Sequence, residues 1–341
     1  MLKTGLIVGS GRQSEALVNL LSSTNQYHLL VFTRSKTSTT SLRLAALANV
    51  EIVVNSAGHG YDLDAFLAAA SRSDFVFVNT DGFELGEQAE TYWGIRLFEL
   101  SRKAHVKHLI YSGLDYASRD SGFDPSLYVG HYEGKARVQQ FMHSQPKSPM
   151  AWTIIRSGPY IENLWQLMAP TIDASGTYVF KLPLGNGAIP FIYLNDLAGY
   201  THWALSNLEQ SNGLDLGVAT AHASGADIAN ALTHVTAKPA QYVDLPIEEW
   251  QVATWKKLPK GPDTKVGSLS VKDDGALLQT YGENFTNWWN LYKASAGNKG
   301  LIQRDYEFLD KILPTRVKDV ADWMRVANYT GERLSTLKIL D

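Results

Sequence analysis

Cysteine is absent from this chain of 341 residues. The absence excludes disulfide bonds, thiolate nucleophiles and cysteine-based metal sites, and it fits an intracellular protein. No apolar run approaches the roughly 20 residues that a membrane-spanning helix needs. The first strand-like segment begins at Thr4, which leaves no room for a secretory signal peptide. We therefore expect a cytoplasmic protein that does not enter a membrane.

Concentrated positive charge is missing as well. The chain carries 31 Lys and Arg against 34 Asp and Glu, a formal net charge of −3, and it has no Lys/Arg block. Because binding to nucleic acid normally needs a concentrated basic face, we expect no direct nucleic-acid partner. Several histidines show no metal-ligand spacing with carboxylates, so we expect no metal site. These histidines are His59, His105, His108 and His143.

What the sequence does contain is a regular alternation of short β-rich segments and helical patterns. Several of the β-rich segments are continuous apolar runs, which is typical of strands buried on both faces. The alternation predicts an α/β fold of the Rossmann type, with a doubly wound parallel sheet. The predicted strands are 4–9, 28–33, 50–54, 75–79, 108–113 and 152–157, and the predicted helices are 14–23, 41–48, 64–73, 86–104 and 134–143.

The alternation breaks after Gly158, where Gly and Pro turns and irregular segments rich in Trp and Tyr follow. We therefore expect a Rossmann domain over residues 1–157, to which later segments return. Residues 158–341 are expected to form mainly a smaller α/β lobe on the substrate or partner side. The tail of this lobe reads as two amphipathic helices separated by Pro314.

The first predicted strand runs into a helix through the turn GSGRQS, residues 9–14. Gly9 permits a tight turn, Gly11 lets the backbone approach a phosphate, and Ser14 is small enough for close helix–strand packing. The free N–H groups at the start of the helix favour an anion, which predicts a bound dinucleotide. A plain strand–helix turn would use the same glycines. The residues expected to bind the dinucleotide here are Gly9, Ser10, Gly11, Arg12 and Gln13.

The end of the second predicted strand, FTRSK, indicates which dinucleotide is bound. NAD-binding proteins usually carry Asp or Glu at this position, and a carboxylate there would repel a 2′-phosphate. Here Arg34 offers a planar guanidinium between the hydroxyls of Thr33 and Ser35, and Arg12 can close over the same phosphate. We therefore predict NADP(H) as the cofactor. The alternative is a solvated basic loop.

Asn79 and Thr80 leave the fourth predicted strand at its carboxyl end, where ligands lie in open α/β sheets. Their side chains are predicted to bind the cofactor, although an Asx-type turn would explain them too.

Six segments occur in an order that resembles the NmrA-like family of the atypical short-chain dehydrogenase/reductase superfamily. They are GSGRQS, FTRS, FVNTDGF, LIYSGLD, HYEGKARVQQF and TIIRSGPYIENL. The tail RDYEFLDKILPTRVKDVADWM resembles the end of fungal members. The family turn usually reads like GATGRQG, whereas this chain is one residue shorter and has Ser14 in place of the last glycine. The resemblance therefore implies a tighter phosphate loop, which bears on cofactor affinity.

The resemblance also implies roles for the segment after the sixth predicted strand. In the family this segment passes beside the nicotinamide, so Pro159 and Tyr160 are expected to contact the cofactor. Tyr160 and Asn163 are expected to line a substrate pocket, or simply to pack.

Typical short-chain dehydrogenases use a Y-x-x-x-K helical turn and a Ser on the preceding strand. The resemblance places Lys135 and Ser112 at the Lys and Ser positions, but the position four before Lys135 holds His131. His131 can act as the proton donor, or Lys135 can act with a lowered pKa as in isoflavone-reductase relatives. In a third reading Lys135 only binds the ribose, as in non-enzymatic members.

Two functions follow from these alternatives. The first is an NADP(H)-dependent reductase of a small organic, aromatic or polyketide-like carbonyl or enone, with Lys135, His131 and Ser112 as catalytic residues. The second is a non-catalytic NADP(H) sensor and transcriptional co-regulator that acts through a regulatory protein partner. The missing tyrosine favours the sensor, and a His/Lys pair beside the nicotinamide favours the enzyme. Nothing in the sequence marks an oligomeric interface.

Overall fold

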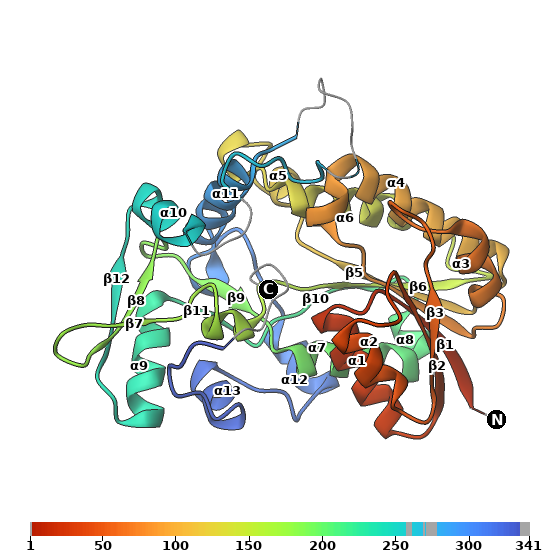
Figure 1. Cartoon of the computed structure of the whole chain (residues 1–341), viewed down its shortest axis with the longest axis horizontal. Coiled ribbons are helices and arrows are strands. Elements are labelled where there is room, and N and C mark those ends of the chain that lie inside the picture. The colour runs from red at the N-terminus through yellow and green to blue at the C-terminus, as the bar shows by residue number, and fades with distance from the viewer. Residues whose placement is uncertain (1, 257–260, 269, 271–277, 335–341) are drawn as a thin grey trace.

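A computed structural model describes residues 2–256, 261–268, 270 and 278–334 of the chain. Its centre is a parallel sheet of seven strands in the order β10-β6-β5-β4-β1-β2-β3 (Figure 1). The predicted Rossmann-type α/β fold is confirmed. The strands are β1 (Lys3–Val8), β2 (Tyr27–Thr33), β3 (Val50–Val54), β4 (Phe75–Val78), β5 (His108–Gly113), β6 (Ala151–Arg156) and β10 (Asp215–Gly217).

Helices cover both faces of this sheet, so both faces are apolar. Along β1, Leu6 and Val8 join the hydrophobic cluster on one face and Ile7 joins the cluster on the other. This explains why the strand reads as an unbroken apolar run. One face carries α1 (Arg12–Ser23), α2 (Thr39–Ala45) and α7 (Leu194–Ser206), and the other carries α3 (Leu63–Ala70), α4 (Gly82–Lys103) and α6 (Gly130–His143).

All five predicted helices begin before the predicted residue, and side chains accept N–H groups at the start of four of them, α1 being the exception among the described residues. α1 begins at Arg12 rather than at residue 14. α4 begins at Gly82 rather than at residue 86. The Asp81 side chain accepts N–H groups of a first helical turn, and a kink at Gly86, where φ is +71°, separates this turn from the rest of α4. α6 begins at Gly130 rather than at residue 134, and the distant side chain of Gln279 accepts the Gly130 N–H at 2.8 Å. Tertiary partners of this kind are not visible in a local pattern.

The rest of the chain forms a second lobe beside the sheet, at the left of Figure 1. It contains a three-stranded sheet, a two-stranded sheet and a hydrophobic cluster of its own. Its strands are β7 (Thr171–Ile172), β8 (Tyr178–Leu182), β9 (Ile189–Phe191), β11 (Ala221–Ala223) and β12 (Ala240–Asp244). Its main helices are α9 (Gly225–Thr236), α10 (Ile247–Trp255) and α11 (Tyr281–Lys293).

The tail contains two further helices, α12 (Tyr306–Ile312) and α13 (Val320–Val326), one on each side of Pro314. Short helical turns complete the described chain: α5 (Ala117–Asp120), α8 (Leu208–Ser211), η1 (Pro125–Leu127), η2 (Ile161–Trp165) and η3 (Gly297–Lys299).

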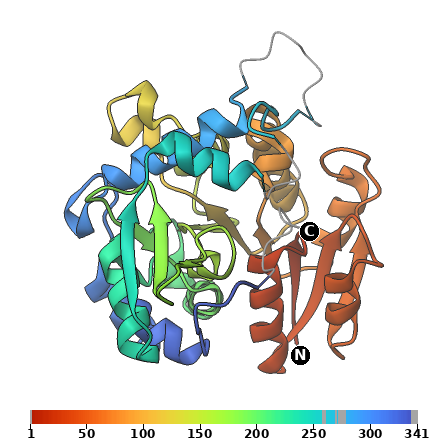
Figure 2. The same ribbon diagram turned by 60° about the vertical axis from the view of Figure 1, so that its left-hand side comes forward.

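The chain passes between the two parts more than once. β10 and α7 follow residue 157 in the sequence but belong to the large sheet. β10 pairs with β6, and α7 packs against the same sheet face as α1. Figure 2 shows the two parts side by side, with the first strands and helices on the right. The domain boundary at residue 157 stays a prediction. None of the described helices has both the length and the apolar character that crossing a membrane requires.

Candidate functional site

A pocket of about 440 Å³ lies at the carboxyl ends of the central strands. This is the edge of an open parallel sheet at which ligands bind. All the residues that the sequence singled out for cofactor, catalysis or substrate line this pocket. They are Gly9, Ser10, Gly11, Arg12, Gln13, Thr33, Arg34, Ser35, Asn79, Thr80, Ser112, His131, Lys135, Pro159, Tyr160 and Asn163. Their individual roles stay predictions.

The glycine turn has the backbone that a phosphate loop needs. Gly9 has φ +89°, and its N–H donates to the Phe32 carbonyl at 2.8 Å. The Ser14 side chain is buried and its hydroxyl donates to the Val8 carbonyl at 3.4 Å, which packs the helix against the strand. Among the residues that the structure describes, none other than its chain neighbours lies within 4 Å of a Cβ added at Gly11, and none caps α1 with its side chain. The N-terminus of α1 is therefore open toward the pocket for an anion.

The end of β2 brings a charged pair to the pocket. The Arg34 guanidinium forms an ion pair with Glu84, which lies in the first turn of α4. Beside it, the hydroxyls of Thr33 and Ser10 are 2.9 Å apart and join the strand end to the glycine turn. Sequence reasoning missed Glu84 because only the packing of α4 against the end of β2 brings it to Arg34.

Lys135 lies in a closed network of buried polar groups. Its Nζ donates to the Thr80 carbonyl at 2.7 Å and to the Thr80 hydroxyl at 3.1 Å, and it lies 3.0 Å from Oε1 of Glu90. The Thr80 hydroxyl donates to the same Glu90 oxygen at 2.7 Å. Because an ammonium has three N–H groups, this network can satisfy all of them.

Glu90 is fully buried, and the sequence analysis did not single it out. Burial raises its pKa, while the charge of Lys135 and the hydroxyl of Thr80 act against the rise. A Cβ at Gly82 or at Gly134 would lie 2.6 or 2.8 Å from Glu90 Oε2, so both glycines leave room for this carboxylate. These two glycines were the signals in the sequence that a side chain approaches closely here.

Ser112 and Gln13 connect the large sheet to the cofactor turn. The Ser112 hydroxyl donates to the Gln13 Oε1 at 2.6 Å, and both side chains are buried. The hydroxyl proton of Ser112 is therefore engaged with the turn in this structure. A role of Ser112 in orienting a substrate stays a prediction.

His131 is packed between aromatic rings at the start of α6. It stacks on Phe83 with ring centroids 4.3 Å apart, and the Tyr132 ring meets it edge-on at 4.8 Å. Burial lowers the pKa of His131 to about 4; the hydrogen bond to Asn284 acts against this shift, and the Lys135 ammonium acts with it. The imidazole is therefore neutral at neutral pH, whereas a histidine that donates a proton as an imidazolium must be charged.

Tyr132 takes part in a different contact. Its hydroxyl is 2.5 Å from the hydroxyl of Tyr292, and both side chains are buried. Burial raises the pKa of Tyr132 to about 12. Tyr132 thus lines the pocket without replacing the tyrosine of typical short-chain dehydrogenases, because its hydroxyl is engaged in the second lobe.

The second lobe supplies an aromatic wall to the pocket. Phe285 and Trp288 of α11 line it together with Phe83, and the Phe83 and Phe285 rings are nearly parallel with centroids 5.9 Å apart. Asn163 is buried at the same pocket, and its Oδ1 has no hydrogen-bond partner among the described residues. The arrangement offers flat apolar surfaces and the unsatisfied Asn163 oxygen to a ligand.

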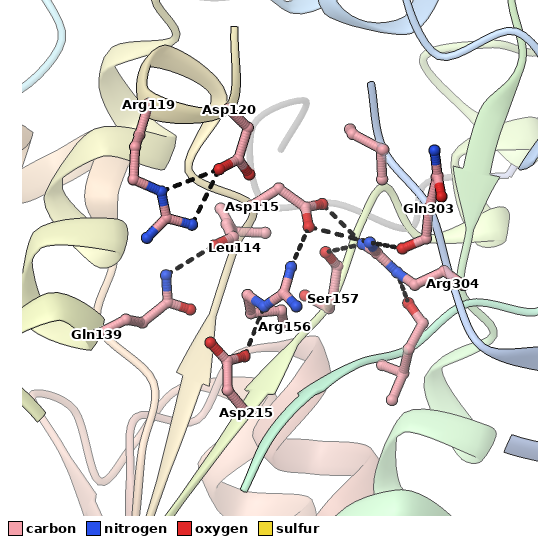
Figure 3. A network of polar contacts seen from close by, with 12 residues as sticks. Leu114, Asp115, Arg119, Asp120, Gln139, Arg156, Ser157, Asp215, Gln303 and Arg304 are labelled. Carbon is pink, nitrogen blue, oxygen red and sulfur yellow. Dashed lines mark hydrogen bonds and ion pairs between the residues drawn. The ribbon is translucent and has the colours of Figure 1, made fainter. Parts of the chain in front are cut away.

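A buried ionic network fixes the tail of the chain to the ends of β5 and β6 (Figure 3). Asp115 accepts hydrogen bonds from Arg304 at 3.0 and 2.7 Å and from Arg156 at 2.7 Å. Burial alone would raise the pKa of Asp115, but the two guanidinium groups outweigh it and hold this pKa below its usual value. Arg304 also donates to the Ser157 carbonyl at 3.4 Å, so the network supports a segment that lines the pocket.

Neither Asp115 nor Arg304 was predicted from the sequence. Asp115 follows β5 and Arg304 lies in the tail, and no short-range sequence pattern indicates that the two residues meet.

The parallel sheet, the glycine turn after its first strand and the pocket at its carboxyl edge define a Rossmann-type protein with its pocket at the dinucleotide-binding position of that fold. The chain belongs to the NmrA-like family, whose sequence profile matches residues 3–264. The predicted family is confirmed.

Two relatives and one solved structure illustrate the similarity. The NAD(P)H azoreductase of Xenophilus azovorans is 29% identical over 153 residues, which cover 45% of this chain and 49% of the azoreductase. The NmrA-like family domain-containing oxidoreductase himF of Aspergillus japonicus is 26% identical over 249 residues, 69% of this chain and 73% of himF. The match with the azoreductase thus spans about half of that protein's length.

The fold is similar to that of NmrA, a negative transcriptional regulator, in its crystal structure with NADP. The TM-score is 0.61, the sequence identity is 16%, and the alignment covers 96% of this chain and 98% of NmrA. At this level of identity the comparison describes the fold alone.

Proposed function

We propose that the pocket binds NADP(H) and that the chain is an NADP(H)-dependent oxidoreductase. The open space at Gly11 and the uncapped start of α1 fit a diphosphate. Arg34, Ser35 and Arg12 line the pocket, and we propose that they bind the adenosine 2′-phosphate. The azoreductase is named as acting with NAD(P)H and NmrA was crystallised with NADP, which supports the same class of cofactor.

The oxidoreductase proposal rests on one observation: the same pocket is lined by the predicted cofactor-binding residues and by the predicted catalytic residues. The cofactor turn lies at one end, and His131, Lys135 and the aromatic wall of α11 line the same cavity. The nicotinamide, when bound, supplies or accepts a hydride. The two relatives are named as an azoreductase and an oxidoreductase, which supports redox chemistry for this chain.

The chain's own residues then have distinct tasks in this proposal. The Lys135 ammonium holds a positive charge at the pocket wall, where it stabilises negative charge that develops on a substrate oxygen. Phe83, Phe285 and Trp288 exclude water and favour a flat substrate. We propose a small aromatic or polyketide-like carbonyl or enone as the substrate class.

NADPH oxidation with a panel of quinones, enones, aldehydes and an azo dye tests this proposal. We expect turnover with at least one class and a loss of about 100-fold in kcat for Lys135→Met, because a buried charge is removed from the site. Glu99→Gln, on the outer part of α4, serves as a matched control with unchanged turnover. Tight NADP binding without turnover of any compound would contradict the enzyme and favour the sensor.

Two observations favour the second candidate, an NADP(H) sensor that acts through a regulatory protein. Glu90 and Thr80 engage the Lys135 ammonium, so the side chain is suited to a structural role. His131 replaces the tyrosine that typical enzymes use. A partner that co-purifies with the NADP-bound but not with the NADPH-bound protein would support sensing.

A further inference from the structure

His131 makes two contacts with one atom of a residue far away in the sequence. Asn284, on α11, is fully buried, and its Oδ1 accepts the backbone N–H of His131 at 3.3 Å. The same Oδ1 lies 2.9 Å from the His131 ring atom Nδ1. A backbone N–H can only donate a hydrogen bond, so it determines which end of the Asn284 amide faces His131.

The tautomer of His131 follows from this pair of contacts. Since the atom opposite Nδ1 is an acceptor, Nδ1 has to carry the hydrogen of the neutral ring. Nε2 is then left with a lone pair. Within the part of the chain that the structure describes, no hydrogen bond reaches Nε2, and the His131 side chain lines the pocket.

The surroundings keep the ring neutral. Phe83 lies over one face, Phe285 of α11 and Tyr132 of α6 are the other rings next to it, and none of these carries a charge at neutral pH. Lys135, one helical turn further along α6, is the charged group that acts on the ring, and its charge opposes protonation. At neutral pH the Nε2 atom of His131 is therefore a hydrogen-bond acceptor toward the pocket and not a donor.

We infer that Asn284 is a positioning residue that holds His131 in the Nδ1–H form, so that Nε2 selects a ligand group that donates a hydrogen bond. With the aromatic wall beside it, the ligand is an aromatic compound that carries a hydroxyl or an N–H group. The inference deepens the proposed function and rests on it only in taking this pocket as the substrate site. It names the polar group by which the substrate is recognised.

The tautomer is tested first, on the coenzyme-free protein. Long-range ¹H–¹⁵N correlation spectra at pH 7, assigned with His131→Phe, are expected to show a protonated Nδ1 and a bare Nε2. A protonated Nε2 would overturn the inference. Asn284→Asp places a carboxylate against Nδ1, which should raise the pKa of His131 and protonate Nε2 as well. Asn290→Asp, on the same helix but bonded to the Ser126 carbonyl, is the matched control and should leave the His131 signals unchanged.

Ligand choice is tested with 2-naphthol and 2-methoxynaphthalene, which differ in whether the oxygen can donate. We expect the wild-type protein to bind 2-naphthol about fivefold more tightly in calorimetry, the ratio that one neutral hydrogen bond provides. In Asn284→Asp the preference should disappear, because Nε2 then donates. Equal binding of the two probes by the wild type, or binding of neither, would overturn the inference.

These measurements use no coenzyme and no turnover. If the protein fails to bind NADP or to oxidise NADPH, the proposed function falls while the tautomer and the probe preference stand. If NADPH is oxidised but the probes are not distinguished, the inference about His131 falls alone.

Discussion

Arg34 at the end of β2 and Glu84 in the first turn of α4 form an ion pair at the wall of the pocket. They are 50 residues apart in the sequence. The pair brings a carboxylate to the residue that was predicted to read the 2′-phosphate of NADP. Cofactor choice is therefore expected to depend on both side chains.

Replacing Arg34 with alanine should weaken NADP binding far more than NAD binding. A charge-assisted contact to the 2′-phosphate is removed, and NAD does not have this phosphate. We expect a loss of about 10- to 100-fold in NADP affinity, measured by calorimetry. Equal losses for the two cofactors would mean that Arg34 does not contact the 2′-phosphate.

Replacing Glu84 with glutamine should have the opposite effect. The neutral amide no longer competes with the 2′-phosphate for Arg34, so NADP affinity should rise by a factor on the order of five, and NAD affinity should stay unchanged or fall. Glu99→Gln removes a carboxylate elsewhere on α4 and serves as the control. Unchanged NADP affinity in Glu84→Gln would contradict competition between the carboxylate and the phosphate.

The buried pair of Lys135 and Glu90 should show strong coupling in unfolding experiments. Glu90→Gln leaves the Lys135 ammonium buried without its counter-charge, and we expect a loss of about 3 kcal/mol in the free energy of unfolding. The double variant Glu90→Gln/Lys135→Met should be less destabilised than the sum of the single variants. Urea denaturation of the four proteins checks this, and simple additivity would show that the two groups do not interact.

His108 provides a prediction about pH. Burial lowers the pKa of this histidine from 6.5 to about 4, and its Nε2 lies 2.8 Å from the Thr153 hydroxyl. Between these two pH values the unfolded chain binds the proton more readily than the folded chain, so this group costs stability as the pH falls.

His108→Gln keeps a polar group near Thr153 and removes this titration. As the pH falls from 6.5 to 4, the free energy of unfolding of the wild type should therefore decrease relative to that of the variant. The decrease should be about 1.4 kcal/mol for each pH unit. Urea midpoints at several pH values measure it, with the exposed His234 replaced by glutamine as a control. A difference that stays constant with pH would show that His108 titrates normally in the folded protein.

The sheet and the cofactor turn could be predicted because their signals are local. Leu6, Ile7 and Val8 form a run that only a strand covered on both faces explains, and Gly9 adopts the positive φ that its residue type permits. The ends of parallel strands meet at one edge of a sheet. It could therefore be predicted from the strand assignments alone that residues following different strands line one pocket.

The partners of the predicted residues could not be obtained in this way. Glu84 beside Arg34, Glu90 beside Lys135 and Asn284 beside His131 come from α4 and α11, and no short-range pattern connects them to their targets. Their effect on charge and protonation depends on burial, which arises only when the helices pack.

The sequence by itself determined which residues gather at the edge of the sheet, because strand periodicity and backbone freedom are properties of neighbouring residues. Only the tertiary structure decided the state in which they meet a ligand. The Lys135 ammonium is paired with the buried carboxylate of Glu90. His131 is neutral, and its Nδ1 hydrogen is directed at Asn284. The physical reason is that protonation and hydrogen bonding respond to desolvation and to groups a few ångströms away in space, however distant they are along the chain.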